Sequence, residues 1–340
     1  MKHHLSPFFI KKILLFLAIG LFFSQIQAQD PVFSQFYASP LQLNPALTGT
    51  VDAPVFHLNY RNQWPSLSQA YVTYAASYSQ LAPKLNSGFG LSVLADVAGN
   101  GIYTGTQIGM HYAYELRFND QLYIRTGLEA NFISKRLAWD KLIFLDQIDI
   151  ETGPYDNNGN ANPTNETQPN LSINYFDFGF GSMIYTPYFY GGIALKHINA
   201  PEEGFLRINN TFGELPMRLT LHAGGQIPLN SHNKYKKEAF ISPNVLFTKQ
   251  RQFHQLNVGA YAKYDVFLGG MWFRHTFSNS DAVIFMLGFE KKFFKIAYSF
   301  DLTVSKLSMA SGGAHEISLI LNFENKKRGT DYNDCLNLFR

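Results

Sequence analysis

The sequence has little cysteine, little charge and no long apolar run beyond its first residues. Cys335 is the only cysteine among 340 residues, so no disulfide can form within the chain. We expect a free, exposed thiol in a polar tail; the alternative is pairing with another chain. No histidine or cysteine group has the spacing of a metal site, so we expect neither metal nor cofactor. Charged residues make up 16% of the chain, against about 25% in soluble domains, which indicates that something other than water covers part of the surface.

Motifs of known catalytic chemistry are also absent. The chain has no Gly-x-Ser-x-Gly elbow, His-Glu-x-x-His, phosphate loop or dinucleotide fingerprint. Residues 156–160 are similar to a calcium loop, but Gly159 stands fourth instead of sixth and Thr167 occupies the place of the bidentate glutamate. A membrane hydrolase would require Ser92 or Ser318 in a forced triad. We therefore expect a protein that is not an enzyme.

Residues 1–28 have the order of a secretory signal. Lys2, Lys11 and Lys12 precede an apolar run at 13–23, and Ala28 is a plausible last residue before cleavage. Because this segment holds three of the 28 basic residues and none of the 25 acidic ones, the remaining 312 residues are neutral. The pI near 8.7 thus reports the signal, and we expect no nucleic-acid partner.

After the signal, no segment has the length of an apolar transmembrane helix, although 16% of the chain is aromatic. In a bilayer every backbone polar group must be paired within the protein, which leaves closed β-barrels. Alternation with period two recurs along the chain, as in 55–62, where apolar and polar side chains alternate. We predict an all-β antiparallel outer-membrane barrel over 55–323 with about fourteen strands. They are expected at 55–62, 70–81, 87–97, 103–116, 121–134, 173–185, 187–197, 216–227, 238–249, 254–264, 266–275, 282–290, 294–301 and 313–323.

The connections support an even strand number with both ends in the periplasm. The two longest, 135–172 and 198–215, follow odd strands, as outer loops should, and most connections after even strands are short. The exception is 228–237, an unusually long periplasmic turn. The charged tail 324–340 is expected in the periplasm.

The segment 29–54 precedes the first predicted strand and is rich in aromatic residues. Its prolines 31, 40 and 45 are incompatible with a central strand or a continuous helix, and Asn44-Pro45 favours a turn. Such an apolar, irregular segment needs burial, and the barrel lumen is the nearest place. We predict an internal plug, with a loose periplasmic leader as the alternative.

At this segment the chain resembles the PorP/SprF family of type IX secretion and gliding-motility outer-membrane proteins. The resemblance continues at the end of the first strand, after the fifth strand (139–147) and in the last strand. Its residues include Gln35, Phe36, Tyr37, Pro40, Asn44, Pro45, Ala46, Gly49, Arg61, Gln63, Trp64, His315 and Glu316.

The resemblance implies an outer-membrane barrel that works with the type IX machinery. Its implied partners are a large secreted surface adhesin with a C-terminal signal domain, peptidoglycan-linked periplasmic proteins and the lipid bilayer. The leading hypothesis is that the outer loops bind this adhesin for surface display. The alternative is a plugged transporter of hydrophobic small molecules, resembling the long-chain fatty-acid channels, which also have an Asn-Pro-Ala turn near the mature start.

Barrel closure predicts one specific contact. The first strand must pair with the last, so the outer end of the first, at Arg61, should lie near the outer start of the last, at Glu316. Alternation points both side chains into the lumen, because Tyr60 and Ile317 take the lipid side. We predict an Arg61–Glu316 ion pair at the barrel seam, with His315 as a candidate third member.

Overall fold

A computed structural model describes residues 30–67, 70–119, 121–156, 158–205, 213–229, 239–277, 279–304, 312–324 and 335–339. The chain divides into two units, Met1–Pro31 and Val32–Arg340, and every element named below belongs to the second. The expected signal, residues 1–28, lies outside the described residues, as do 230–237 of the long turn and 325–334 of the tail.

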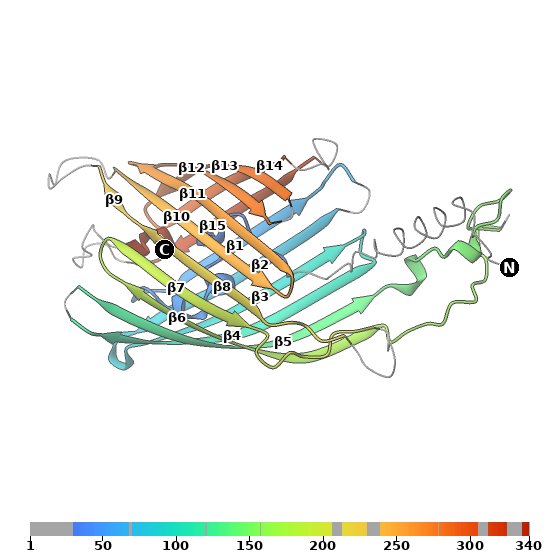
Figure 1. Cartoon of the computed structure of the whole chain (residues 1–340), viewed down its shortest axis with the longest axis horizontal. Helices are drawn as coiled ribbons and strands as arrows, with labels where there is room; N and C mark the ends of the chain where they lie inside the picture. Colours follow the sequence, from blue (N-terminus) through green and yellow to red (C-terminus); the bar gives the residue numbers. More distant parts are fainter. Residues whose placement is uncertain are drawn as a thin grey trace, which may run out of the picture. The chain divides into compact units, whose positions relative to one another are not determined.

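The described chain forms one antiparallel sheet that closes on itself as a fourteen-strand barrel (Figure 1). Its strands are β1 (Val55–Gln63), β2 (Tyr71–Ala82), β3 (Ser87–Ala98), β4 (Tyr103–Arg117), β5 (Tyr123–Leu137), β6 (Ser172–Tyr185), β7 (Phe189–Lys196), β8 (Arg218–Gly225), β9 (Ile227–Pro228), β10 (Ala239–Gln250), β11 (Phe253–Tyr264), β12 (Phe267–Thr276), β13 (Asn279–Lys291), β14 (Phe294–Thr303) and β15 (Ala314–Asn322).

The short β9 continues β8 beyond a break at Gln226, and both pair with β10, so the two make one wall strand. β1 pairs with β15 from Val55 opposite Asn322 to Gln63 opposite Ala314. The predicted fold is therefore confirmed, with strand ends within three residues of those expected. The alternation of apolar and polar residues predicted the strands correctly because one face of each strand meets lipid and the other meets the lumen.

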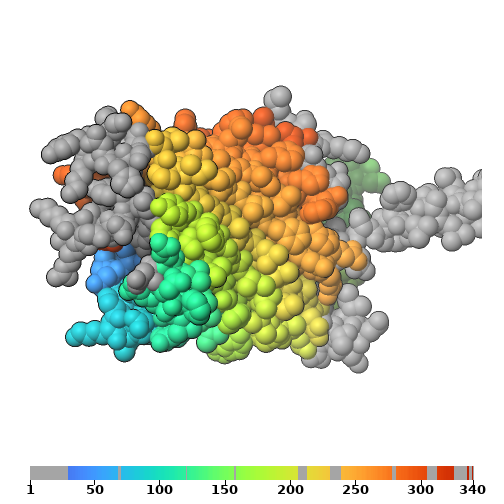
Figure 2. All heavy atoms as spheres, turned by 60° about the vertical axis from the view of Figure 1, so that its left-hand side comes forward, coloured from blue at the N-terminus to red at the C-terminus, as the bar shows by residue number. Residues whose placement is uncertain are grey.

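Burial alternates along the strands as the barrel requires. On β1, residues 55, 57, 59 and 61 are buried, whereas the residues between them are more exposed. Figure 2 shows the side on which the middle strands of the chain, yellow-green to orange, lie next to one another. Outward-facing residues on these strands are mostly apolar and include Ile193, Leu221, Val245, Val258 and Met271. Lipid replaces water at such a surface, which explains the low charge of the chain.

The two barrel ends differ in their connections. At the end where β1 begins, most connections are tight, as at 186–188 and 265–266, and the exception is the long connection between β9 and β10. At the opposite end lie the long connections 138–171, in green in Figure 1, and 197–217. This is the arrangement of outer-membrane barrels, whose short turns face the periplasm. Among the described residues, no helix has the length and hydropathy needed to cross a membrane.

Candidate functional site: the filled lumen

The N-terminal segment lies within the ring of strands. It forms η1 (Phe36–Ala38), α2 (Pro40–Leu43) and η2 (Pro45–Leu47), and Pro40 and Pro45 take first helical positions, where no backbone N–H is needed. Apart from Gln42, every residue from 33 to 49 is buried. These residues bond to inward-facing side chains on walls as far apart as β5 and β15. The segment therefore fills the lumen instead of lying below it.

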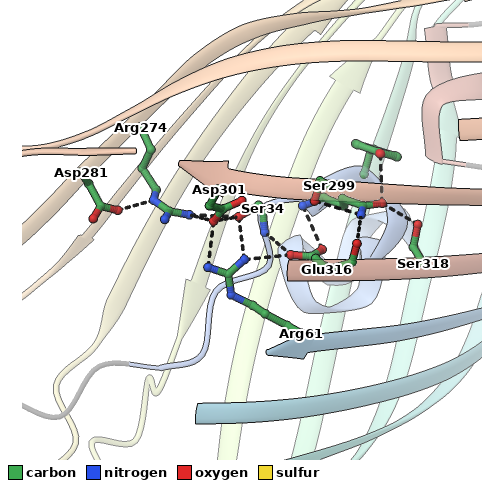
Figure 3. Close-up of polar contacts among 10 residues, drawn as sticks. Ser34, Arg61, Arg274, Asp281, Ser299, Asp301, Glu316 and Ser318 are labelled. Atoms are coloured by element: carbon green, nitrogen blue, oxygen red, sulfur yellow. Dashed lines mark hydrogen bonds and ion pairs between the residues drawn. The ribbon is translucent and has the colours of Figure 1, made fainter. Parts of the chain in front are cut away.

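The barrel seam holds the start of this plug. Arg61 on β1 donates to Glu316 on β15 at 3.0 Å and to Asp301 on β14 at 2.9 Å (Figure 3). Arg274 on β12 binds the same Asp301 oxygen at 2.9 Å. The four side chains are buried, and Arg274 also pairs with the partly exposed Asp281 (Figure 3). Pairing with opposite charge is what makes buried charges tolerable. The predicted Arg61–Glu316 pair is confirmed.

Glu316 also binds the plug backbone. Its two carboxylate oxygens accept the N–H groups of Ser34 at 2.8 Å and Gln35 at 3.0 Å. The Ser34 hydroxyl donates to Asp301 at 2.6 Å and accepts from Arg61 at 2.8 Å (Figure 3). The charged seam thus fixes the plug by charge-assisted hydrogen bonds, which are stronger than neutral ones.

Gln35 is a second polar anchor. Its side-chain amide nitrogen donates to Ser299 at 3.0 Å and to the Glu316 carbonyl at 3.1 Å. Its amide oxygen accepts from Ser318 at 2.6 Å and from the Tyr37 hydroxyl at 3.2 Å. Both ends of the buried amide are therefore satisfied, which avoids the cost of an unpaired polar group.

Aromatic packing joins the plug to strands β11 and β12. Tyr37 stacks on Tyr261 of β11 and Trp272 of β12, with ring centroids 5.8 and 6.1 Å apart. Phe36 meets Trp272 edge to face at 6.3 Å. These four rings bury a large apolar area and explain why the plug is rich in aromatics.

The Asn44-Pro45-Ala46 turn packs against the barrel wall at glycine residues, where no side chain keeps the turn away from the strands. An added Cβ at Gly181 would lie 1.9 Å from the Asn44 amide oxygen, and one at Gly127 would lie 2.3 Å from the Pro45 carbonyl carbon. The Asn44 oxygen accepts the Ala46 N–H at 2.9 Å and so caps η2. Its nitrogen reaches the Ile193 carbonyl at 3.2 Å. Only glycine leaves room for backbone this close to a strand.

Arg125 on β5 closes the other end of η2. Its guanidinium donates to the carbonyls of Ala46, Thr48 and Gly49 and pairs with Glu115. The sequence analysis did not identify Arg125 as part of the site. Its only signal in the sequence is a charged residue within the predicted strand 121–134.

A second charged group lines the wall nearer the long loops. Glu129 on β5 binds Lys196 of β7 at 3.1 Å and lies 3.6 Å from His111 of β4. Asp177 on β6 binds His197 at 2.9 Å. All five side chains are buried. Sequence reasoning missed this group, because its members come from four strands and share no motif.

The C-terminal segment departs from expectation. Residues Cys335–Phe339 form η7, in which Cys335, Leu336 and Phe339 are at most 1% exposed. The thiol donates to the Thr186 carbonyl at 2.9 Å, and Phe339 packs edge to face on Tyr190 at 5.2 Å. The expected exposed thiol was therefore wrong. The tail was predicted to be exposed because charged residues precede Cys335. The last residues, however, are largely apolar and therefore favour burial.

The remaining predicted residues lie at the outer end of the seam. Gln63 is the last residue of β1. The backbone N–H of Trp64 donates to the Gly313 carbonyl at 2.8 Å, and the Trp64 ring packs edge to face on Tyr71. His315 does not join Arg61 and Glu316. It alternates to the outward face with Ile317 and bonds the Tyr298 hydroxyl at 2.8 Å. Within the described part of the chain, no three histidine, cysteine or acidic side chains are arranged to hold a metal.

Comparison with known families explains this arrangement. The family model described as type IX secretion system membrane protein PorP/SprF matches residues 25–321. The chain belongs to the PorP/SprF family. As a PorP/SprF protein with a barrel fold, it is located in the outer membrane and is associated with type IX secretion. A search of curated proteins finds no match.

Solved structures of low identity share the barrel architecture with this PorP/SprF protein. A deletion mutant of the monoaromatic hydrocarbon channel TodX is 12% identical, covering 82% of this chain and 92% of its own, with a TM-score of 0.46. A FadL homologue from Pseudomonas aeruginosa is 11% identical, covering 83% and 93%, with a TM-score of 0.44. Omp33 from Acinetobacter baumannii is 8% identical, covering 80% and 99%, with a TM-score of 0.44.

Proposed function

We propose that this PorP/SprF protein anchors a large secreted adhesin at the cell surface through its outer loops. In this proposal the barrel is a rigid base in the membrane, and it acts by binding and not by catalysis. The adhesin would be held through its C-terminal signal domain for surface display and gliding motility. Peptidoglycan-linked proteins would contact the short turns on the periplasmic side.

The observation that carries the proposal is that the chain fills its own lumen. The N-terminal plug is tied to the wall by the Arg61, Glu316 and Arg125 networks, and η7 packs against the plug from the periplasmic end. A barrel filled by its own ends offers its loops as the surface for a partner. The connections 138–171 and 197–217 are the longest at the outer end.

A pull-down in mild detergent with mass spectrometry tests this proposal. The tagged full-length chain is compared with a variant in which a short Gly-Ser turn replaces 138–171, and with a control that replaces the tight turn 99–102. We expect a large surface protein to be lost from the first variant alone, with the heat-induced gel shift of the folded barrel unchanged in both. Equal recovery from all three would count against the loop as the binding surface.

A second candidate is uptake of hydrophobic small molecules. The aromatic group of Phe36, Tyr37, Tyr261 and Trp272 against the plug is the observation that favours it. Uptake of long-chain acids that stops on deletion of the gene, and returns with the loop variant, would favour this candidate over anchoring.

A further inference from the structure

The outer connection 138–171 has a polar interior and an apolar exterior. Among the described residues of this connection Gln147 alone is buried, and its side-chain nitrogen donates to the Asn162 carbonyl at 2.6 Å. Asn162 returns a bond to the Gln147 carbonyl at 2.7 Å and reaches Gly153 at 3.0 Å. The amide pair therefore holds two distant stretches of the connection together.

Aspartates fix the turns around this amide pair. Asp146 accepts from Asn165 at 2.7 Å, Asp149 from Glu151 at 2.8 Å, and Asp156 from Asn160 at 2.8 Å, in each case from a backbone N–H. The Asp149 and Asp156 bonds are the local turns that aspartate favours, whereas the Asp146 bond joins residues 19 positions apart. The connection is thus ordered by its own polar groups, and Figure 1 shows it reaching beyond the ends of the neighbouring strands.

Its aliphatic side chains face outward. Ile150 is fully exposed at 102% and Leu145 is 89% exposed, while Ile143 and Ile148 are about half exposed at 53% and 51%. Four large aliphatic residues within eight positions make an apolar strip on a connection that extends beyond the strand ends. Strips of this kind on a soluble surface mark interaction sites.

The charge of the connection is mainly negative. Residues 138–171 include six acidic residues, 140, 146, 149, 151, 156 and 166, and one basic residue, Lys141, so six minus one leaves five net negative charges. Lys141 donates to the Asn100 carbonyl at 3.0 Å. Glu151 and Glu166 are exposed, and their carboxylates accept no hydrogen bond from the described residues. Their charge is therefore available to a partner.

This charge selects among possible occupants. A second copy of the chain would place two acidic loops against each other, and phosphate-bearing lipid would also be repelled. A protein surface with an apolar centre and a lysine or arginine rim fits both features. We propose that residues 143–151, with Glu166, form the docking strip for the secreted partner, and that the partner's contact surface is apolar with a basic rim. This inference rests on the proposed anchoring function and specifies its chemistry.

The test uses the surface protein that mass spectrometry identifies as dependent on the loop. Its affinity for the full-length barrel is measured in detergent against Leu145→Ser/Ile150→Ser, with Asn158→Ser/Gln168→Ser as the matched control at exposed polar positions. We expect a loss of tenfold or more for the first pair and little change for the control, because apolar anchors dominate interfaces. Equal affinities would overturn the docking strip.

The charge component is tested separately with Glu151→Gln/Glu166→Gln, which keeps the shape of the loop. We expect affinity to fall severalfold and its dependence on salt to weaken, since screening then removes less attraction. Affinity that rises, or salt dependence that is unchanged, would overturn the basic rim. Cross-linking of the strip to a second barrel or to lipid would overturn the choice of partner. If loop replacement leaves every surface protein in place, the anchoring function itself fails; if only the point variants have no effect, anchoring stands and this inference fails.

Discussion

The lumen and the outer connection 138–171 both invert the arrangement of a soluble protein, for different reasons. The lumen buries charge, with Arg61, Arg274, Asp301 and Glu316 at most 7% exposed. The connection instead exposes aliphatic residues, with Ile150 and Leu145 almost free of contacts. In the lumen the inversion follows from lipid, which takes the apolar face of every strand and leaves polar residues inside. In the connection, which extends beyond the strand ends, the docking of a partner proposed above would give the exposed aliphatic residues a role.

The largest expected effect lies in the lumen. Arg61→Leu leaves Asp301 with Arg274 alone and removes the cation beside the buried carboxylate of Glu316. Removing one member of a buried ion pair costs about 3–5 kcal/mol. We expect the free energy of unfolding to fall by that amount, measured by urea unfolding in detergent, and the heat-induced gel shift to occur at lower temperature.

Arg136→Leu is the matched control, because Arg136 is exposed near the outer end of β5. Its free energy of unfolding should change by less than about 1 kcal/mol. Similar losses of unfolding free energy in the two variants would mean that the seam ion pairs stabilise the barrel no more than an exposed arginine does. The contrast between lumen and loop would then weaken.

The seam also shows how far sequence could lead. Closure of an even barrel fixes which strands are neighbours, so Arg61 and Glu316 could be paired from the register of the first and last strands. Asp301 and Arg274 could not, because β12 and β14 do not pair with β1, and their side chains meet Arg61 or one another only on the inner face of the closed wall. Alternation alone already argued against His315, which has the same parity as the outward Ile317.

The plug illustrates a similar limit. Prolines and aromatic residues in 29–54 predicted irregular structure in need of burial. The glycines that receive it, Gly127 and Gly181, look like ordinary weak points in strands, and only the folded register places them under Asn44 and Pro45. The end of the chain was misjudged because neighbouring charges outweighed Leu336 and Phe339 in the reading of the tail.

The next effect in size concerns the fit between plug and wall. Gly181→Ala places a methyl 1.9 Å from the Asn44 amide oxygen, so the turn must move and its hydrogen bonds lengthen. Overpacking of this kind costs about 1–3 kcal/mol. Gly191→Ala on the adjacent strand is the control, since its Cβ would meet open space.

We expect protease cleavage within the plug and a lower urea midpoint for Gly181→Ala, with Gly191→Ala close to wild type. If both variants behave alike, the plug is held by its polar anchors and not by its fit to the glycines. That result would sharpen the comparison by assigning the stability of the lumen to charge alone.

A smaller effect is expected at the periplasmic end, where apolar packing instead of charge closes the lumen. Phe339→Ala removes the ring that packs on Tyr190 and should release η7 from the wall. The thiol of Cys335, 1% exposed in the intact protein, reports this release directly. We expect maleimide labelling at least tenfold faster, equivalent to about 1.4 kcal/mol in the docking equilibrium.

Leu85→Ala is the control on the same side, because Leu85 is 60% exposed on the turn before β3. Its labelling rate should match wild type. Rapid labelling of the unaltered protein would show that η7 does not stay packed on the barrel wall in the membrane. The lumen would then be filled by the N-terminal plug alone.

The smallest effect separates the carboxylates of the loop from those of the lumen. The backbone N–H of Asn165 lowers the pKa of Asp146, that of Thr152 lowers the pKa of Asp149, and that of Asn160 lowers the pKa of Asp156. A lowered pKa in the folded loop means that these bonds stabilise it above the unfolded aspartate value of about 3.9 and are lost as pH falls through the lower folded value. Hydrogen exchange, corrected for the intrinsic rate at each pH, should therefore show protection of 146–165 falling below about pH 4, while strands β4 and β5 keep theirs. Loop protection that is constant, or highest in acid, would mean that the aspartates do not order the connection, and that the exposed aliphatic strip lacks the fixed polar support on which its binding role depends.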